Sequence, residues 1–218
     1  MIGRARSSTG PAAVRQRAVV HRIAALVLEY PDEELLARLP ELRTAASTLD
    51  APFRVPLEGL VAHLSCTPPL QLAAEYVATF DLRRRCCLYL TYYAYGDTRK
   101  RGMALLTFKQ AYRAAEVELS ADELPDHLCV LLEFAATADA EAGHRLLVEH
   151  RAGLELLRLA LTDAGSPYAG ALEAVSATLP RLAGNDREVV ARLAAEGPPG
   201  EDVGLEPFAP PDYMGART

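Results

Sequence analysis

The spacing of the prolines limits where long helices can form in this chain. Fifteen prolines are spread over 218 residues, and the longest interval without one runs from Pro69 to Pro125. Proline interrupts a helix because it has no backbone N–H and its ring clashes with the preceding turn. Within this interval, residues 76–112 hold six of the nine tyrosines, two of the four cysteines and seven lysines and arginines. This mixture of aromatic and charged residues indicates a segment that contributes about half of its residues to the core and half to a functional surface.

Apolar residues repeat with the period of an α-helix through most of the chain. Leu57, Leu60, Val61 and Leu64, for example, have the i, i+3, i+4, i+7 spacing of a helix that buries one face. No stretch alternates apolar and polar residues as a half-buried strand would. We therefore expect an all-α fold, a single globular bundle of about nine or ten helices. The expected domain covers residues 14–196, between a flexible arm at 1–13 and a disordered, acidic, proline-rich tail at 197–218.

Local signals predict where individual helices begin and end. Asp32 and Asp126 have the position and residue type of helix N-caps, and Asp97 can cap the helix that follows Gly96. Ser166 and Pro167 resemble a cap and a first helical position. The other expected features are a division of the second helix at Pro40, one long helix over about 140–162, a helix from 166 that ends at Gly184, and a last helix over 186–196.

The charge balance restricts the partners of this chain. Asp and Glu number 29 against 23 Lys and Arg, which gives a net charge of −6. Nucleic-acid binding normally uses a basic excess to displace counterions, so we expect no nucleic-acid partner. An acidic protein is suited to binding a basic peptide. The first residues lack the apolar core of a signal peptide, and no apolar run could span a membrane, so we expect a cytoplasmic protein without membrane insertion.

Enzyme signatures are missing from the sequence. Gly96 and Gly102 have neither the spacing nor the Gly-Lys-Ser/Thr ending of a phosphate-binding loop. We therefore expect no catalytic residue, no cofactor and no metal. The alternative is a helical metal-binding protein or enzyme that uses Cys86, Cys129 and His127. On a helix, His127 and Cys129 would point to different faces, which favours ordinary core or loop roles for them.

Three consecutive motifs in the proline-free interval resemble those of a known family. They are YVATFD at 76–81, RRRCCLYLTYY at 83–93 and GDTRKRGM at 96–103. Together they are similar to the NarJ-type assembly chaperones of respiratory nitrate reductase, also called the delta subunit family. The motif ELPDHL at 123–128, followed by Leu132-Glu133-Phe134, resembles the wider TorD-like redox-enzyme chaperones. The resemblance covers about residues 15–195.

The resemblance implies a non-enzymatic, all-helical, cytoplasmic chaperone. Such proteins bind the N-terminal segment of the nitrate reductase catalytic (alpha) subunit and hold the apoenzyme open. The molybdenum cofactor is then inserted before the complex docks with its membrane subunit. The sequence does not determine the oligomeric state and leaves a homodimer open.

A helical scaffold with an aromatic groove and an acidic rim can bind an amphipathic client helix. We expect the groove to be formed or backed by Tyr76, Phe80, Tyr89 and Tyr92. Carboxylates that attract basic client residues are expected at Asp81, Asp97, Glu123 and Asp126, oriented by Arg101 and His127. The arginine cluster around residues 83–85 is expected to be a solvated face. The competing interpretation is an adaptor that binds polyanions through these arginines.

Overall fold

The computed structural model describes residues 10–96, 98–120, 123–182 and 184–196, and these form a bundle of α-helices. The helices are α1 (Pro11–Val27), α2 (Glu33–Ser47), α3 (Ala51–Cys66), α4 (Pro69–Tyr76), α5 (Leu90–Tyr95), α6 (Arg99–Ala114), α7 (Leu128–Thr137), α8 (Ala140–Glu149), α9 (Arg151–Asp163), α10 (Ala169–Ala177) and α11 (Gly184–Glu196). A π-helical turn at Val77–Asp81 and a 3-10 turn at Arg84–Cys86 lie between α4 and α5. The all-α prediction is confirmed, with one helix more in the described residues than the nine or ten expected.

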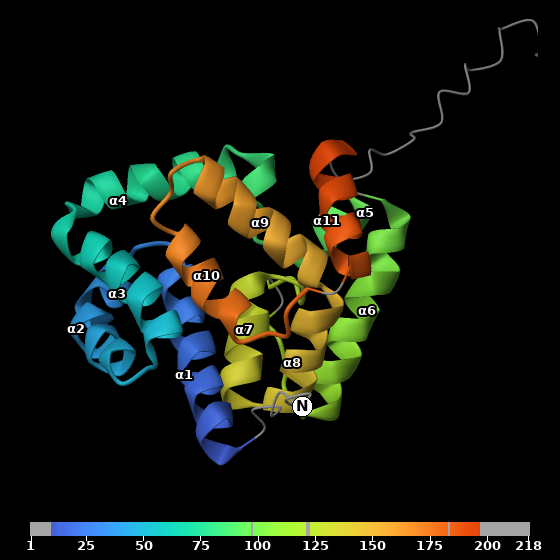
Figure 1. Ribbon diagram of the computed structural model, residues 1–218, viewed down its shortest axis with the longest axis horizontal. Coiled ribbons are helices and arrows are strands. Elements are labelled where there is room, and N and C mark those ends of the chain that lie inside the picture. The colour runs from blue at the N-terminus through green and yellow to red at the C-terminus, as the bar shows by residue number, and fades with distance from the viewer. Residues whose placement is uncertain (1–9, 97, 121–122, 183, 197–218) are drawn as a thin grey trace, which may run out of the picture.

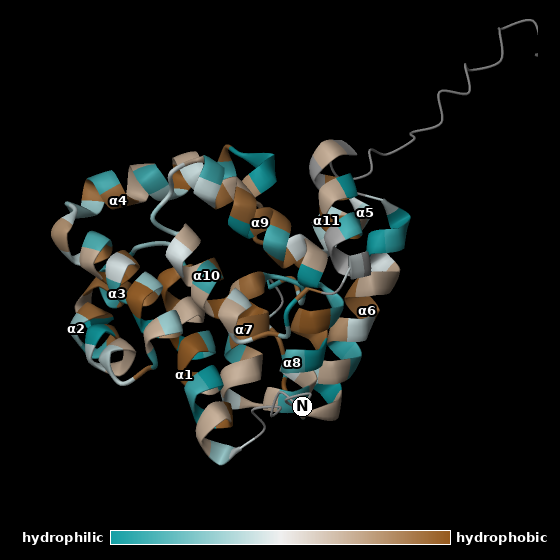
Figure 2. Cartoon of the chain, viewed as in Figure 1, coloured by the Kyte–Doolittle hydropathy of each residue, from teal (hydrophilic) through white to brown (hydrophobic). Residues whose placement is uncertain are grey.

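Helices far apart in the sequence form the centre of the bundle. The first helix, α1, packs along α7, and α10 packs against both α3 and α9; Figure 1 shows α1 and α7 side by side. Ile23, Leu60, Leu131 and Leu172 are at most 1% exposed. Full burial of such a side chain contributes about 1.5–3 kcal/mol to stability. Outer helices such as α4 and α6 carry both hydrophilic and hydrophobic residues along their length (Figure 2).

The start of α1 and the course of α2 differ in part from the prediction. Asp32 caps α2 as expected, because its carboxylate accepts a hydrogen bond from the Leu35 N–H at 2.8 Å. Pro40 does not divide the helix: α2 runs through it without a break and buries Leu39 and Leu42 on either side. The first helix begins at Pro11 rather than at residue 14, because proline is well suited to the first turn of a helix.

The long helix expected over 140–162 is two helices that meet at His150. Its backbone (φ −100°, ψ 22°) ends α8 and precedes α9. Two glycines make close packing possible on either side of the break. A Cβ at Gly143 would lie 2.4 Å from the Ala135 Cβ of α7, and one at Gly153 would lie 2.9 Å from the Leu90 carbonyl oxygen of α5. The break lets α8 pack against α7 and α9 pack against α5. The periodicity of the sequence does not encode this break.

The end of α10 also differs from the prediction. This helix ends at Ala177, well before Gly184, which is instead the first residue of α11. The residue before a proline disfavours helical backbone, so the chain leaves the helix ahead of Pro180. The expected arm and tail fall mainly on residues 1–9 and 197–218, which lie outside the described residues. In the described part of the chain, no helix is long and apolar enough to cross a bilayer.

Candidate functional site

Two segments that are distant in the sequence meet at the start of α7. An isolated antiparallel bridge joins Tyr89, in the tyrosine-rich segment, to His127, in the ELPDHL turn. Two backbone hydrogen bonds flank the bridge, from the Leu90 N–H to the Asp126 carbonyl (3.1 Å) and from the Leu128 N–H to the Leu88 carbonyl (2.8 Å). The pairing fixes the first turn of α5 against the first turn of α7.

Asp126 lies inside the protein and does not cap α7 as expected. The N-cap of α7 is His127, and Asp126 is 0% exposed. Its Oδ2 accepts hydrogen bonds from the Thr91 N–H (3.2 Å) and the Thr91 hydroxyl (2.5 Å), and it pairs with Arg101 Nη2 at 3.5 Å. The carboxylate therefore caps the start of α5 from a distant segment. Because Asp126 has no exposed surface, it fixes the position of its neighbours and contributes nothing to the outer surface.

Arg101, Tyr89 and His127 form a half-buried layer over Asp126. The guanidinium carbon of Arg101 lies 5.4 Å from the centre of the Tyr89 ring, and Arg101 Nε donates to the Thr91 hydroxyl at 3.1 Å. The Tyr89 and His127 rings meet edge to face at 5.1 Å. Burial lowers the pKa of His127, although the nearby Asp126 and Glu123 carboxylates oppose the shift. The imidazole is therefore mainly neutral near pH 7.

Tyr76 and Phe80 belong to a separate aromatic cluster. Their ring centres are 4.8 Å apart, and both contact Tyr168, at 5.9 and 5.0 Å. The Tyr76 hydroxyl donates to the Leu28 carbonyl at 3.1 Å. Tyr76 and Phe80 are 8% and 9% exposed, whereas Tyr30, stacked edge-on against Tyr76, is 49% exposed. Tyr76 and Phe80 can thus back a binding surface, and Tyr30 is the member of the cluster that reaches solvent.

The other predicted site residues occupy different positions. Tyr92 is half-buried and packs against Tyr93 with ring centres 6.1 Å apart. Asp81 is exposed at the end of the π-helical turn. Asp97 lies outside the described residues, and the N-cap of α6 is Thr98. Glu123 is exposed and lines a hollow beside α7.

That hollow, the α7 hollow, lies beside α7 and has a volume of about 230 Å³. Its floor and rim include Leu119, Val130, Phe134, Glu118, Glu123 and Glu133. Tyr112 also lines it and donates from its hydroxyl to the Pro125 carbonyl at 2.7 Å, which anchors the ELPDHL turn. Glu133 pairs with Arg22 of α1, and Glu118, Glu123 and Glu133 are all exposed.

A second hollow, the α1–α2 hollow, has a volume of about 240 Å³ and is lined by Leu26, Glu29, Tyr30, Asp32, Glu34 and Leu35, with Arg38 at its edge. Glu29 connects it electrostatically to the α7 hollow. Partial burial of the Glu29 carboxylate raises its pKa, the hydrogen bond with Cys129 opposes this shift, and the charges of Glu123, Glu133 and Asp32 add to it. Glu123 and Glu133 of the α7 hollow thus lie close enough to Glu29 of the α1–α2 hollow to act on its charge, and we call the linings of the two hollows together the acidic surface.

Glu29, His127 and Cys129 are the residues of the described chain that could hold a metal ion, since their ligand atoms all lie within 4.8 Å of one another. The expectation that His127 and Cys129 diverge is wrong. His127 precedes α7 with extended backbone (φ −63°, ψ 129°), so helical geometry does not apply to it. Cys86 is not a member of this group.

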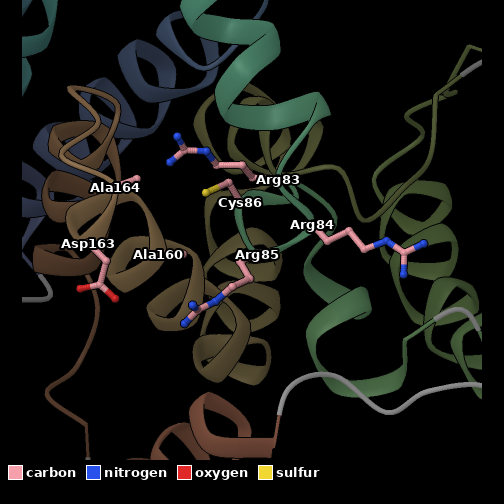
Figure 3. A pocket seen from close by; sticks show the side chains of 7 residues that line it. All are labelled: Arg83, Arg84, Arg85, Cys86, Ala160, Asp163 and Ala164. Carbon is pink, nitrogen blue, oxygen red and sulfur yellow. The ribbon is translucent and has the colours of Figure 1, made fainter.

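Cys86 instead lines a hollow of about 410 Å³ between the 3-10 turn and the end of α9. Figure 3 shows Arg83 and Arg85 on either side of Cys86, with Asp163 of α9 opposite and Arg84 directed away. All three arginines are exposed, which confirms the expected solvated face. Burial raises the pKa of the Cys86 thiol, although Arg83 and Arg85 oppose the shift, so the thiol is not activated.

The all-helical fold has a solved counterpart. A crystal structure of a putative redox enzyme maturation protein from Archaeoglobus fulgidus superposes with a TM-score of 0.56 and 21% sequence identity, over 73% of this chain and 91% of that chain. The two chains therefore share one all-helical fold.

The family follows from the sequence comparison: the chain belongs to the nitrate reductase delta subunit family, whose model matches residues 46–174. It is 30% identical over 167 residues to the probable nitrate reductase molybdenum cofactor assembly chaperone NarJ of Bacillus subtilis, which covers 76% of this chain and 91% of that protein. It is 31% identical over 153 residues to NarJ of Escherichia coli K12, over 67% and 64% of the two chains.

A more similar sequence belongs to a much longer protein. The nitrate reductase-like protein NarX of Mycobacterium tuberculosis is 45% identical over 160 residues, which cover 73% of this chain and 24% of NarX. The chain thus spans about a quarter of that relative.

Several residues of the acidic surface escaped the sequence analysis. Glu29, Glu118 and Glu133 are ordinary surface acids in the sequence, and only the packing of α1 along α7 brings them together. Asp32, predicted as an N-cap, marks the start of the second helix but does not reveal what α1 contacts.

Proposed function

We propose that this chain is an assembly chaperone of nitrate reductase. It binds the N-terminal segment of the apo catalytic (alpha) subunit and supports insertion of the molybdenum cofactor before the complex docks with its membrane subunit. Membership of the delta subunit family supports this role, as do the names of the NarJ relatives, which are molybdenum cofactor assembly chaperones. The chain itself performs no chemistry in this scheme.

The observation that carries the proposal is the acidic surface. Each hollow combines an apolar floor with at least three carboxylates in its lining. An amphipathic helix can place its apolar side chains in such hollows and direct Lys and Arg toward the rim. The raised pKa of Glu29 reflects, besides partial burial, the crowding of negative charge that a cationic client would relieve.

The buried Asp126 network supplies the rigidity that this surface needs. Asp126, Thr91 and Arg101 hold the start of α5 against the ELPDHL turn, and that turn leads into α7, whose outer side lines the hollow. A preformed site loses less conformational entropy on binding than a mobile one. The family motifs thus build the support, while the contact surface consists largely of Glu29, Glu118, Glu123 and Glu133 with their apolar neighbours.

The test is calorimetric titration with the N-terminal peptide of the nitrate reductase catalytic subunit from the same source. Replacing Glu118 and Glu123 together with Gln should weaken binding about 2- to 30-fold, because each rim pair contributes about 0.2–1 kcal/mol. Binding by the unmodified protein should weaken as the salt concentration rises. Val130→Asp should weaken binding more strongly, since it places a carboxylate on the apolar floor of the α7 hollow.

Matched controls separate the surface from general effects. Glu173→Gln removes an exposed carboxylate of α10, and Val148→Asp changes an exposed valine of α8; neither residue lines the two hollows. Both controls should bind as the unmodified protein does. Unchanged affinity in the Glu118/Glu123 variant and in Val130→Asp, with circular dichroism preserved, would remove the proposed surface. Failure of the unmodified protein to bind the peptide or to co-purify with the apoenzyme would remove the chaperone assignment.

A further inference from the structure

A Glu, a His and a Cys converge at the contact between α1 and α7. Glu29 follows the end of α1, His127 is the N-cap of α7, and Cys129 lies in its first turn. The carboxylate oxygen, ring nitrogen and sulfur lie within 4.8 Å of one another. The three residues come from segments about 100 positions apart, so the cluster is a product of the tertiary fold.

The burial of the three side chains forms a gradient from core to solvent. Cys129 is 2% exposed, His127 is half-buried and Glu29 is exposed. The Cys129 thiol is hydrogen-bonded to the Glu29 carboxylate, and the bridge to Tyr89 holds the backbone of His127 in place. Cys129 thus lies in the core, His127 is held in place by its backbone, and the Glu29 carboxylate is open to solvent.

We propose that Glu29, His127 and Cys129 form a binding site for one Zn²⁺ ion, with a fourth coordination position open to water. Thiolate, imidazole and carboxylate are the three ligand types that zinc takes in proteins, and three protein ligands plus water is an established arrangement. Bond lengths of about 2.0–2.3 Å place tetrahedral ligands about 3.3–3.8 Å apart, so the three atoms must approach by at most about 1.5 Å. Glu29, as the exposed member, can rotate toward the other two ligands.

Binding exchanges one hydrogen bond for metal coordination. Zn²⁺ takes the place of the thiol proton that Cys129 shares with Glu29, and that proton is released to solvent. Glu123, Glu133 and Asp32 lie near Glu29 and add negative charge that favours a cation at this point. This site goes beyond the chaperone role, because it requires no client.

Cobalt substitution and calorimetry test the site directly. In a Cys66→Ser background, which removes the exposed thiol, the metal-free protein should bind one Zn²⁺ per chain. Co²⁺ should produce visible d–d bands together with a thiolate-to-cobalt charge-transfer band. Cys129→Ser should abolish the charge-transfer band and weaken Zn²⁺ binding at least about 100-fold, which is the upper range seen for residues that only support the ligands.

Glu29→Gln provides a second variant that does not disturb the core. Its side chain is exposed, so folding should be preserved, and Zn²⁺ affinity should fall at least about tenfold. Glu34→Gln, a neighbouring surface carboxylate outside the three-residue cluster, is the matched control and should retain the affinity. Zn²⁺ binding that disappears in Cys66→Ser alone, or that persists unchanged in both Cys129→Ser and Glu29→Gln, would overturn the proposal. Peptide binding does not enter this test, so its outcome is independent of the client assignment.

Discussion

Replacing Asp126 with Ala tests whether this residue is a local helix cap or a clamp between distant segments. A local N-cap contributes about 1 kcal/mol. The structure instead gives Asp126 two hydrogen bonds from Thr91 and an ion pair with Arg101, all at a side chain with no exposed surface. Loss of these partners leaves the buried Thr91 N–H unsatisfied and Arg101 without its carboxylate. We expect Asp126→Ala to lower the free energy of unfolding by about 3–5 kcal/mol.

Asp126→Asn and Asp32→Ala calibrate this value. Asn keeps an oxygen for the Thr91 N–H and loses the charge, so a decrease of about 1–2 kcal/mol is expected. Asp32 is a true local cap, on α2, and Asp32→Ala should reduce stability by about 1 kcal/mol. The measurement is urea unfolding followed by circular dichroism, with comparable m-values for all four proteins. If Asp126→Ala costs no more than Asp32→Ala, the clamp is absent and the residue is a local cap after all.

The remaining predictions concern pH and packing. Burial lowers the pKa of His21 to about 3, so between pH 6.5 and pH 3 the unfolded chain binds a proton that the folded chain does not. Stability should therefore fall as the pH drops below 6.5, by about 2 kcal/mol at pH 5 from this residue, and His21→Asn should flatten the decline seen in thermal unfolding. Gly143→Ala forces a Cβ to 2.4 Å from the Ala135 Cβ and should reduce stability by about 1–3 kcal/mol. Gly59→Ala, with open space around the new methyl group in α3, should increase it by about 0.5–1 kcal/mol in the same assay.

Much of the helical fold could be predicted because its signals are local. The periodic leucines of α3 and the cap at Asp32 each depend on a few neighbouring residues, and the structure contains both. Resemblance to family motifs added the assembly-chaperone class. The break at His150 and the end of α10 were missed because they depend on which helix packs against which.

Asp126 shows why the candidate site could be predicted only in part. The sequence identified the residue and its partner Arg101, but it assigned Asp126 to the helix that follows, whereas its hydrogen bonds go to Thr91, 35 positions earlier. His127 was read as helical, although it is the residue just before the helix. A change of one residue at a helix boundary thus decides whether His127 and Cys129 diverge or converge. Such boundaries are the least certain part of any assignment from sequence.

The acidic surface should make binding and stability respond in opposite directions to one substitution. Glu123 raises the pKa of Glu29, which means that the two carboxylates repel each other in the free protein. Glu123→Gln should therefore stabilise the free chain slightly, by about 0.2–0.5 kcal/mol, while it weakens peptide binding about 1.5- to 5-fold. The pKa of Glu29, followed by NMR, should move down toward its ordinary value in this variant. Glu173→Gln should leave the pKa of Glu29 unchanged. If the pKa of Glu29 does not change in Glu123→Gln, the two hollows are electrostatically separate. A single client helix could not then be attracted by the carboxylates of both hollows at once.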